Sequence, residues 1–450
     1  MVIGKIRIKK FEFCYFFYMV ILMSFMTTET RVMPGGLSHP IAWAIPFLWT
    51  ICIIIRNKVS FWNNNFLILI AICFLWSIVQ IIVKDTFEIR QLGLYFSFLY
   101  VIVVAYVHIN VYKKRLFELY EYCMVIMCKI SLLLWIISNV FMSSFAAIAK
   151  LFPVTGFGRN IMFVYNWMDP TSGQTQGFLL RNAGCSWEPG RFAVMICLAI
   201  AINMLRRGTS LSNNDNIKWL LIALATTFST TGYVITALLY LLFTFKMSNL
   251  TSYIYALLLA VFFIIGALNL SFVGDKLISK FDLRLELENI NYNEAWYESQ
   301  EKYIAIDRFP SIYFEIDNLI HDPVIGYGKD TSLSHFSKRH STYYSTTGGL
   351  VQMFSLYGIF LGMFFYYLLY KSSHRIAYDL HSEKGYIIFL FFLFSLISYP
   401  LFEFAVFSAI WLYDILLTKD SKKYSQIRKQ FLMRRLTARL KIANNVNCKK

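Results

Sequence analysis

Long apolar stretches separated by short polar segments form the main pattern along this chain. An α-helix needs about 20 apolar residues to cross a bilayer. The sequence predicts twelve such segments, at residues 11–27, 40–55, 65–83, 92–110, 121–142, 192–205, 217–231, 233–246, 252–271, 348–370, 385–401 and 403–418. We therefore expect an all-α, polytopic membrane protein with about twelve transmembrane helices.

The polar segments divide the chain into four parts. Residues 1–271 hold the first nine spans and an outer loop at 143–190, and residues 272–347 form a large, partly helical outer loop. Residues 348–418 hold the last three spans, and residues 419–450 are a basic tail. The tail has an apolar stripe among its cations, which is typical either of a helix lying on an anionic leaflet or of a disordered tail that fixes topology.

Two segments predict local structure. The stretch between Lys218 and Lys246 is too short for two full spans, so we expect a hairpin of short helices with its tip at residues 229–232. One long, kinked helix is the alternative. Apolar residues recur at helical spacing from residue 309 to 320, which predicts an amphipathic helix on the surface of the membrane domain that ends before Pro323.

Composition and charge exclude several classes of protein. Hydrophobic residues make up 57% of the chain and charged residues 15%, against roughly 25% charged residues in soluble proteins, which excludes a soluble enzyme. The net charge is +17, and most of the 43 lysines and arginines fall in segments that are inside if both termini are cytoplasmic. This excess follows the positive-inside rule and does not indicate a nucleic-acid partner. Residues 27–31 offer no small-residue cleavage pattern, so we expect an uncleaved first helix.

No cofactor motif is present. The cysteines have no zinc spacing, the histidines lack the i, i+4 pair of a zincin helix, and no Walker or Rossmann glycine pattern occurs. ATP, nicotinamide and zinc chemistry are therefore not indicated, and we expect neither a cofactor nor a metal.

The polar segment before the span at 192–205 carries the first candidate site. Arg181 and Arg191 flank Glu188 there, beside Trp187 and a Pro-Gly pair that begins the helix. A helix N-terminus beside guanidinium groups suits phosphate oxygens. Alternatively, Glu188 only pairs with Arg191 while Arg181 anchors a lipid headgroup, and Trp187 is an interfacial anchor.

The late outer loop carries the second candidate group. Arg308 begins the amphipathic helix, and Lys338, Arg339 and His340 lead toward the tenth span. Histidine is the natural proton acceptor near neutral pH. A solvated loop residue is the alternative interpretation of His340.

Three motifs, in this order and in these loops, resemble those of the bacterial O-antigen polymerases, which are relatives of the O-antigen ligases. They are Arg181-x-x-Gly184-x-x-x-Glu188-Pro189, Ser229-Thr230-Thr231-Gly232-Tyr233, and Arg308 before a helix closing with His321-x-Pro323-x-x-Gly326-x-Gly328. The resemblance covers roughly residues 175–365, including Gly358-x-x-x-Gly362. Ligases of this group usually have an arginine after the hairpin serine and a His-Asn pair, whereas this chain has Thr230 and His340–Ser341, which favours a polymerase.

The resemblance implies a glycosyltransferase that joins undecaprenyl-diphosphate-linked repeat units at the periplasmic face of the bacterial inner membrane, with no nucleotide sugar and no obligatory metal. The large late loop is then periplasmic. Expected partners are the lipid-linked oligosaccharide, membrane lipids and a chain-length regulator protein. The expected substrate-binding residues are Arg181, Arg191, Arg308, Arg339 and Trp187, and the expected catalytic residues are His340 and Glu188.

Within that set, the arginines at 181, 191 and 308 are the candidates for the diphosphate, because a guanidinium donates bidentately and stays charged. We expect His340 to be the base and Glu188 to fix Arg191 or the acceptor. An O-antigen ligase and a lipid-linked oligosaccharide flippase are the alternative functions. A flippase needs cations inside the membrane, and Lys129 is the clearest such residue.

Overall fold

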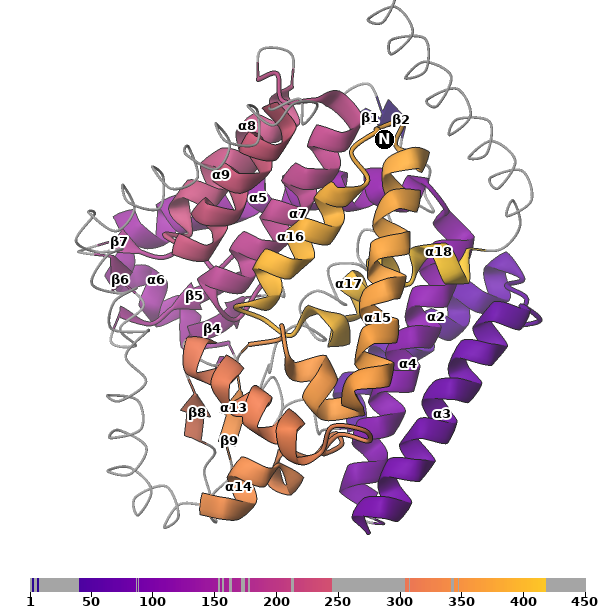
Figure 1. Cartoon of the computed structure of the whole chain (residues 1–450). Coiled ribbons are helices and arrows are strands. Elements are labelled where there is room, and N and C mark those ends of the chain that lie inside the picture. The colour runs from indigo at the N-terminus through magenta and orange to yellow at the C-terminus, as the bar shows by residue number, and fades with distance from the viewer. Residues whose placement is uncertain are drawn as a thin grey trace, which may run out of the picture.

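A computed structural model describes residues 40–244 and 308–417 apart from short gaps, together with three short strands outside those ranges (Figure 1). The described part is mostly helical, as predicted. Its α-helices are α2 Pro40–Asn57, α3 Asn64–Lys84, α4 Ile89–Tyr112, α5 Arg115–Val140, α6 Met142–Ala149, α7 Pro189–Arg207, α8 Asp215–Thr226, α9 Thr230–Thr244, α13 Arg308–His321, α14 His335–His340, α15 Gln352–Asp379, α16 Tyr386–Leu396, α17 Ala405–Trp411 and α18 Tyr413–Leu416.

Five helices are long and apolar enough to cross a membrane. They are α3, residues Leu92–Tyr112 of α4, α5, α7 and α15. Shorter apolar helices cover Phe47–Asn57, Thr230–Phe243 and Tyr386–Leu396. The predicted spans at 11–27 and 252–271, and the tail at 419–450, lie outside the described residues. Five helices are thus candidate membrane spans by length and composition, and the total of twelve stays a prediction.

The hairpin predicted between Lys218 and Lys246 is confirmed and the single long helix is not found, but the turn lies at residues 227–229 and not at the predicted 229–232. Helix α8 ends at Thr226 and α9 begins at Thr230, with Phe228 between them at a positive φ of 48°. Gly232 lies so close to α7 that a Cβ atom there would be 2.7 Å from Cβ of Ala193. The tip of the hairpin is therefore held against the first turns of α7.

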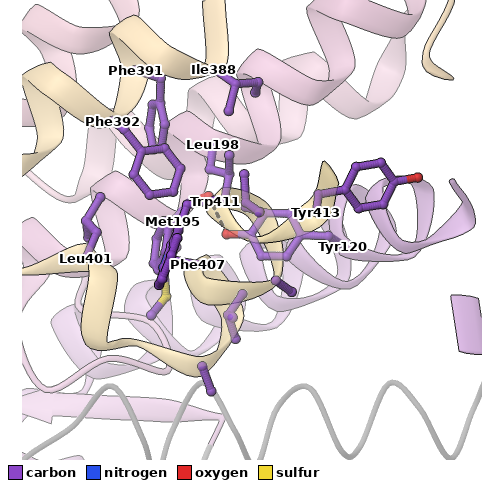
Figure 2. Packing of buried hydrophobic residues seen from close by; sticks show 14 of the residues in the cluster. Tyr120, Met195, Leu198, Ile388, Phe391, Phe392, Leu401, Phe407, Trp411 and Tyr413 are labelled. Atoms are coloured by element: carbon purple, nitrogen blue, oxygen red, sulfur yellow. Dashed lines mark hydrogen bonds between the residues drawn. The ribbon is translucent and has the colours of Figure 1, made fainter. Parts of the chain in front are cut away.

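Helix α7 lies at the centre of the described part, and its side chains from Phe192 to Leu205 are buried. It packs against α5, α8, α9 and α16. Figure 2 shows Met195 of α7 beside rings from α16 and α17. Tyr120 of α5 donates a hydrogen bond to the Met195 carbonyl oxygen over 3.0 Å. Since such a helix is fixed by packing along its whole length, the residues at its start are held rigidly.

One end of this core contains a buried carboxylate that joins three helices. Glu121 of α5 lies 2.5 Å from Nη1 of Arg206 on α7, and its Oε1 accepts hydrogen bonds of 2.7 Å from the amides of Asn203 and Asn216. Both carboxylate oxygens of this 1% exposed residue thus have a donor. A buried charge that is paired in this way fixes the register of the helices around it.

Helix α15 is broken at Gly358, whose φ of 81° is left-handed. The loop that follows α13 fills the break, because Ile359 N donates to Pro323 O over 2.8 Å and Gly328 N donates to Leu356 O over 3.1 Å. A Cβ atom at Gly358 would lie 1.8 Å from Val324 O, so only glycine fits. The loop and the broken helix therefore form one unit.

The amphipathic helix predicted from residue 309 to 320 is confirmed as α13, but its apolar stripe is not the face that packs. Ser311, Glu315 and Asn318 are buried, whereas Tyr313 and Ile316 are exposed. The Glu315 carboxylate accepts a hydrogen bond from Ser355 of α15. The polar face thus points inward, and the apolar face is left on the outside, where a bilayer surface can cover it.

Short strands occur in both of the segments that were predicted to be outer loops, residues 143–190 and 272–347. In the first, β3 Val154–Thr155, β4 Gly158–Ile161 and β5 Tyr165–Met168 form an antiparallel sheet, and β6 Thr175–Gln176 pairs with β7 Leu179–Leu180. In the second, β8 Ile304–Ile306 pairs in parallel with β9 Tyr344–Thr346. The β8–β9 pair closes the segment just before α13 and so fixes the start of that helix. At the N-terminus, β1 Val2–Ile3 pairs with β2 Ile6–Arg7.

Candidate functional site

A partly buried ion pair joins two segments that the sequence singled out separately. Nη2 of Arg308, the first residue of α13, lies 3.1 Å from Oε1 of Glu188, the N-cap residue of α7. The two side chains are 22% and 20% exposed. The pair is therefore shielded enough to be well ordered and open enough to meet a ligand.

The hydroxyl group of Tyr399 bridges this ion pair. Nη2 of Arg308 donates to Tyr399 Oη over 2.7 Å, and Oη donates to Oε1 of Glu188 over 2.9 Å. Nη1 of Arg308 donates to Oγ1 of Thr231 over 2.9 Å, and that oxygen lies 3.2 Å from Oγ of Ser398. The hairpin tip, α7, α13 and the turn after α16 thus meet at one guanidinium group.

Two glycines allow these segments to approach so closely. A Cβ atom on Gly190 would lie 2.0 Å from Oη of Tyr399, and one on Gly349 would lie 2.5 Å from Cα of Pro400. Gly349 N also donates to Leu396 O over 2.7 Å, which holds the turn after α16 in place. Any side chain at either position would push the turn after α16 away from the ion pair.

Arg181 caps the hairpin next to the same cluster. Its Nε donates to Thr227 O over 3.1 Å and its Nη2 to Phe228 O over 3.2 Å, which satisfies carbonyls left at the end of α8. Burial lowers the pKa of Arg181, with a smaller lowering by Arg308, while the Glu188 carboxylate opposes the shift. A guanidinium group stays protonated under such a shift, so a second cation lies close to the ion pair.

Arg191 is held by aromatic rings. Its guanidinium carbon lies 4.6 Å from the ring centroid of Trp187, 5.2 Å from that of Phe404 and 5.6 Å from that of Tyr399. Among the described residues the ion pair of Glu188 is with Arg308, so the simpler interpretation, in which Glu188 only pairs with Arg191, is wrong. Cation–π contacts hold a guanidinium in position without neutralising its charge.

The cluster has more positive than negative charge. Arg181, Arg191 and Arg308 converge near one carboxylate, Glu188, at the start of a buried helix. The N-terminal end of α7 adds its partial positive charge. An anion with two charges, such as a diphosphate, fits this balance, and the carboxylate and the Tyr399 hydroxyl can orient a neutral hydroxyl group beside it.

The second predicted group is divided, because Arg308 lies in this cluster whereas Lys338 and Arg339 lie on α14. Helix α14 packs on the later half of α13, where Phe336 N donates to Oδ1 of Asn318 over 3.1 Å. Lys338 and Arg339 are exposed, and in the described part of the chain no hydrogen bond or ion pair joins either to Arg308. The side chain of His340 lies outside the described residues.

Sequence reasoning missed Tyr399 and a second ion pair near it. Tyr399 lies inside an apolar segment, and the one signal was the Ser398-Tyr399-Pro400 sequence that interrupts it. Lys329 pairs with Glu403, four residues beyond Tyr399, and its Nζ lies 5.5 Å from the ring centroid of Phe98. Neither partner belongs to a motif, so only the fold brings them together.

The chemistry of these residues stands without support from relatives. Neither a scan against protein-family models nor a search of curated proteins found a match.

Proposed function

We propose that this chain is a membrane glycosyltransferase, an O-antigen or capsular polysaccharide polymerase, that joins undecaprenyl-diphosphate-linked repeat units at the periplasmic face of the inner membrane. The sequence resemblance over roughly residues 175–365 suggests this function. The observation that carries the proposal is the convergence of Arg308, Glu188 and Tyr399, with Arg181 beside them, at the ends of apolar helices. Each of the three motifs that carry the resemblance supplies residues to this one cluster.

The arginines would bind the diphosphate of the donor. Arg308 is an accessible candidate, because its side chain is 22% exposed and both of its terminal nitrogens donate to hydroxyl groups within the cluster. A diphosphate can displace the hydroxyl partners and accept from the same planar group. Arg181 and Arg191, fixed by carbonyls and by aromatic rings, would supply the remaining positive charge without moving.

The proposed reaction is a displacement at the anomeric carbon of the growing chain. The acceptor hydroxyl oxygen forms a bond to that carbon while the bond from carbon to the diphosphate oxygen breaks, and undecaprenyl diphosphate leaves with the electron pair. The acceptor proton goes to a base. We keep His340 as the proposed base, since Glu188 is engaged by Arg308 and by the Tyr399 hydroxyl and is thus suited to orienting the acceptor.

An apolar groove of about 710 Å³ between α3 and α4 has the chemistry that a polyprenyl tail requires. Its lining includes Phe74, Ile78 and Tyr95. At its edge, the Tyr95 hydroxyl accepts a hydrogen bond of 3.4 Å from the backbone N of Lys329, the residue that pairs with Glu403. One chain segment, from Tyr399 to Glu403, therefore reaches from the cationic cluster toward the groove.

The alternative functions have less support. A flippase requires cations in an interior cavity, but Lys129 is exposed on the outside of α5, with its Nζ 5.1 Å from the ring centroid of Trp219. In that position its charge can reach the bilayer surface along the helix. No specific observation favours a ligase, so we retain the polymerase alone.

The decisive experiment is deletion of the gene followed by separation of glycolipids on a gel. Loss of a polymerase leaves a single repeat on the lipid, whereas loss of a ligase leaves polymer on the carrier and loss of a flippase leaves neither. Complementation with Arg181→Lys tests the cluster at the same time, because lysine keeps the charge and loses the two carbonyl contacts. A deletion strain with unchanged polymer would end the proposal.

Topology can be tested by thiol labelling from the periplasm in a chain that lacks Cys52, which is exposed, and also Cys14 and Cys448, which lie outside the described residues. Exposed positions are required, so we choose Leu151→Cys and Lys338→Cys for the two outer segments and Glu383→Cys as the cytoplasmic control. The proposal predicts labelling of the first two by an impermeant reagent and none of the third. Labelling of only one outer position would place the two halves of the site on opposite faces.

A further inference from the structure

Two histidines and an aspartate converge on the outer side of α13, away from the arginine cluster. Asp317 and His321 are one turn apart on α13, and His335 is the first residue of α14. Nδ1 of His335 lies 3.1 Å from Oδ2 of Asp317, and Nδ1 of His321 lies 3.7 Å from Oδ1 of the same carboxylate. The two imidazole rings stack with centroids 3.4 Å apart.

We propose that Asp317, His321 and His335 bind a first-row transition-metal dication, such as Zn²⁺, that clamps α13 to α14. One ligand atom from each residue lies within 4.8 Å of the other two. Two imidazole nitrogens and one carboxylate oxygen are a ligand set that zinc takes, with water in the fourth position. The proposal concerns a different place from the arginine cluster and does not depend on the proposed function.

The surrounding fold already holds the ligands together. The rings of Phe314 and Phe336 have centroids 4.0 Å apart, and Phe336 N donates to Oδ1 of Asn318 over 3.1 Å. These contacts fix α14 against α13 on either side of the ligand positions. The site therefore needs no rearrangement of the backbone to form.

The two rings must turn out of their stack to complete the coordination, because the in-plane lone pairs of parallel rings cannot meet at one ion. Ligand atoms in a tetrahedral zinc site are about 3.4 Å apart, given metal–ligand bonds of roughly 2.0 to 2.1 Å. The side chains of Asp317, His321 and His335 are 27%, 44% and 33% exposed, so the rings can turn and an ion can enter from solvent. Nδ1 of His321 also lies 2.8 Å from Asp317 O, which leaves Nε2 as the nitrogen it can offer.

This set does not follow the zincin pattern of two histidines at i, i+4. A carboxylate takes the first position, and the second histidine follows fourteen residues later on another helix. A carboxylate and a histidine one helical turn apart present their ligand atoms to the same face.

The test is metal binding by the purified full chain, carrying a tag without histidine and stripped with a chelator. We expect one Zn²⁺ per chain with a Kd tighter than about 1 μM, measured by competition with a chromogenic chelator. His335→Ala and His321→Ala should each weaken binding at least about tenfold. His374→Ala, at a partly exposed histidine of α15 that is not in the cluster, is the matched control and should bind as the unchanged chain does.

A second measurement uses no variant and so does not depend on how variants fold. Co²⁺ in place of Zn²⁺ should give visible absorption of a four-coordinate site in the unchanged chain, and Zn²⁺ should raise its thermal unfolding midpoint. Absence of the Co²⁺ bands at saturation would overturn the proposal. Equal Zn²⁺ affinity in His335→Ala and in the unchanged chain would overturn it independently.

Discussion

The bridging hydroxyl group of Tyr399 allows a test of the site with a single atom removed. Tyr399→Phe keeps the ring that lies against Arg191 and Arg308 but deletes the 2.7 Å bond from Arg308 and the 2.9 Å bond to Glu188. The ion pair itself remains. If the cluster orients substrate, its geometry should loosen while its charge stays the same.

The size of the effect follows from these two bonds. A hydrogen bond to a charged group contributes about 1.5 to 3 kcal/mol. Because the ion pair is roughly one-fifth exposed, water can replace part of what is lost, so we take the value of one bond, about 2 kcal/mol. If that amount stabilises the transition state, the polymerisation rate should fall about 30-fold.

The assay is the rate of polymer formation from a purified lipid-linked repeat, with the polymer ladder of complemented cells as a second measurement. Tyr413→Phe is the matched control, because the Tyr413 hydroxyl donates to Oδ2 of Asp379 over 2.9 Å at the opposite end of α15. It removes the same atom from the same kind of bond far from the cluster. We expect the control to polymerise at the unchanged rate per folded molecule.

Two outcomes would refute this reasoning. If Tyr399→Phe polymerises at the full rate at normal protein levels, its hydroxyl is not part of the site. If Tyr413→Phe loses as much activity as Tyr399→Phe, both losses reflect stability alone, and the cluster needs another explanation.

Three other predictions follow from the same structure. Arg308→Lys should lower polymerisation sharply, since lysine cannot donate to three partners from one plane, and full-length polymer from this variant would remove Arg308 from the site. His340→Ala should abolish polymerisation and Glu188→Gln should only reduce it; the reverse result, read on the same gels, exchanges their roles. Gly358→Ala should lower the unfolding midpoint, because φ is positive and Val324 O is 1.8 Å from the new Cβ, whereas Gly93→Ala, with nothing within 4 Å, should raise stability by up to about 1 kcal/mol.

Local patterns predicted those parts of the fold that a single stretch of sequence determines. A membrane helix must be apolar along its whole length, so α3, α5 and α15 were visible as runs. The α8–α9 hairpin followed from counting residues between Lys218 and Lys246, because two spans cannot fit there. The turn of this hairpin includes Ser229, the residue at which the predicted tip begins.

The partners of the site residues could not be predicted in this way. Glu188 and Arg308 are 120 residues apart, and nothing near either residue specifies the other. Helix α13 shows the same limit, because its apolar stripe is visible in the sequence but the buried partners of Glu315 and Asn318 are not. Periodicity tells which side of a helix is apolar, and tertiary packing decides which side is covered.

The wide separation of the cluster residues along the chain has a consequence for biogenesis. Glu188 and Tyr399 are 211 residues apart, so at about 5 to 20 residues per second Tyr399 is synthesised roughly 10 to 40 s after Glu188. During that interval the first helices are in the membrane with a carboxylate and guanidinium groups that lack their final neighbours. We therefore expect destabilising substitutions in α16 or α17 to leave those charges accessible to quality-control proteases. Such variants should be degraded in the cell and should not accumulate as inactive protein.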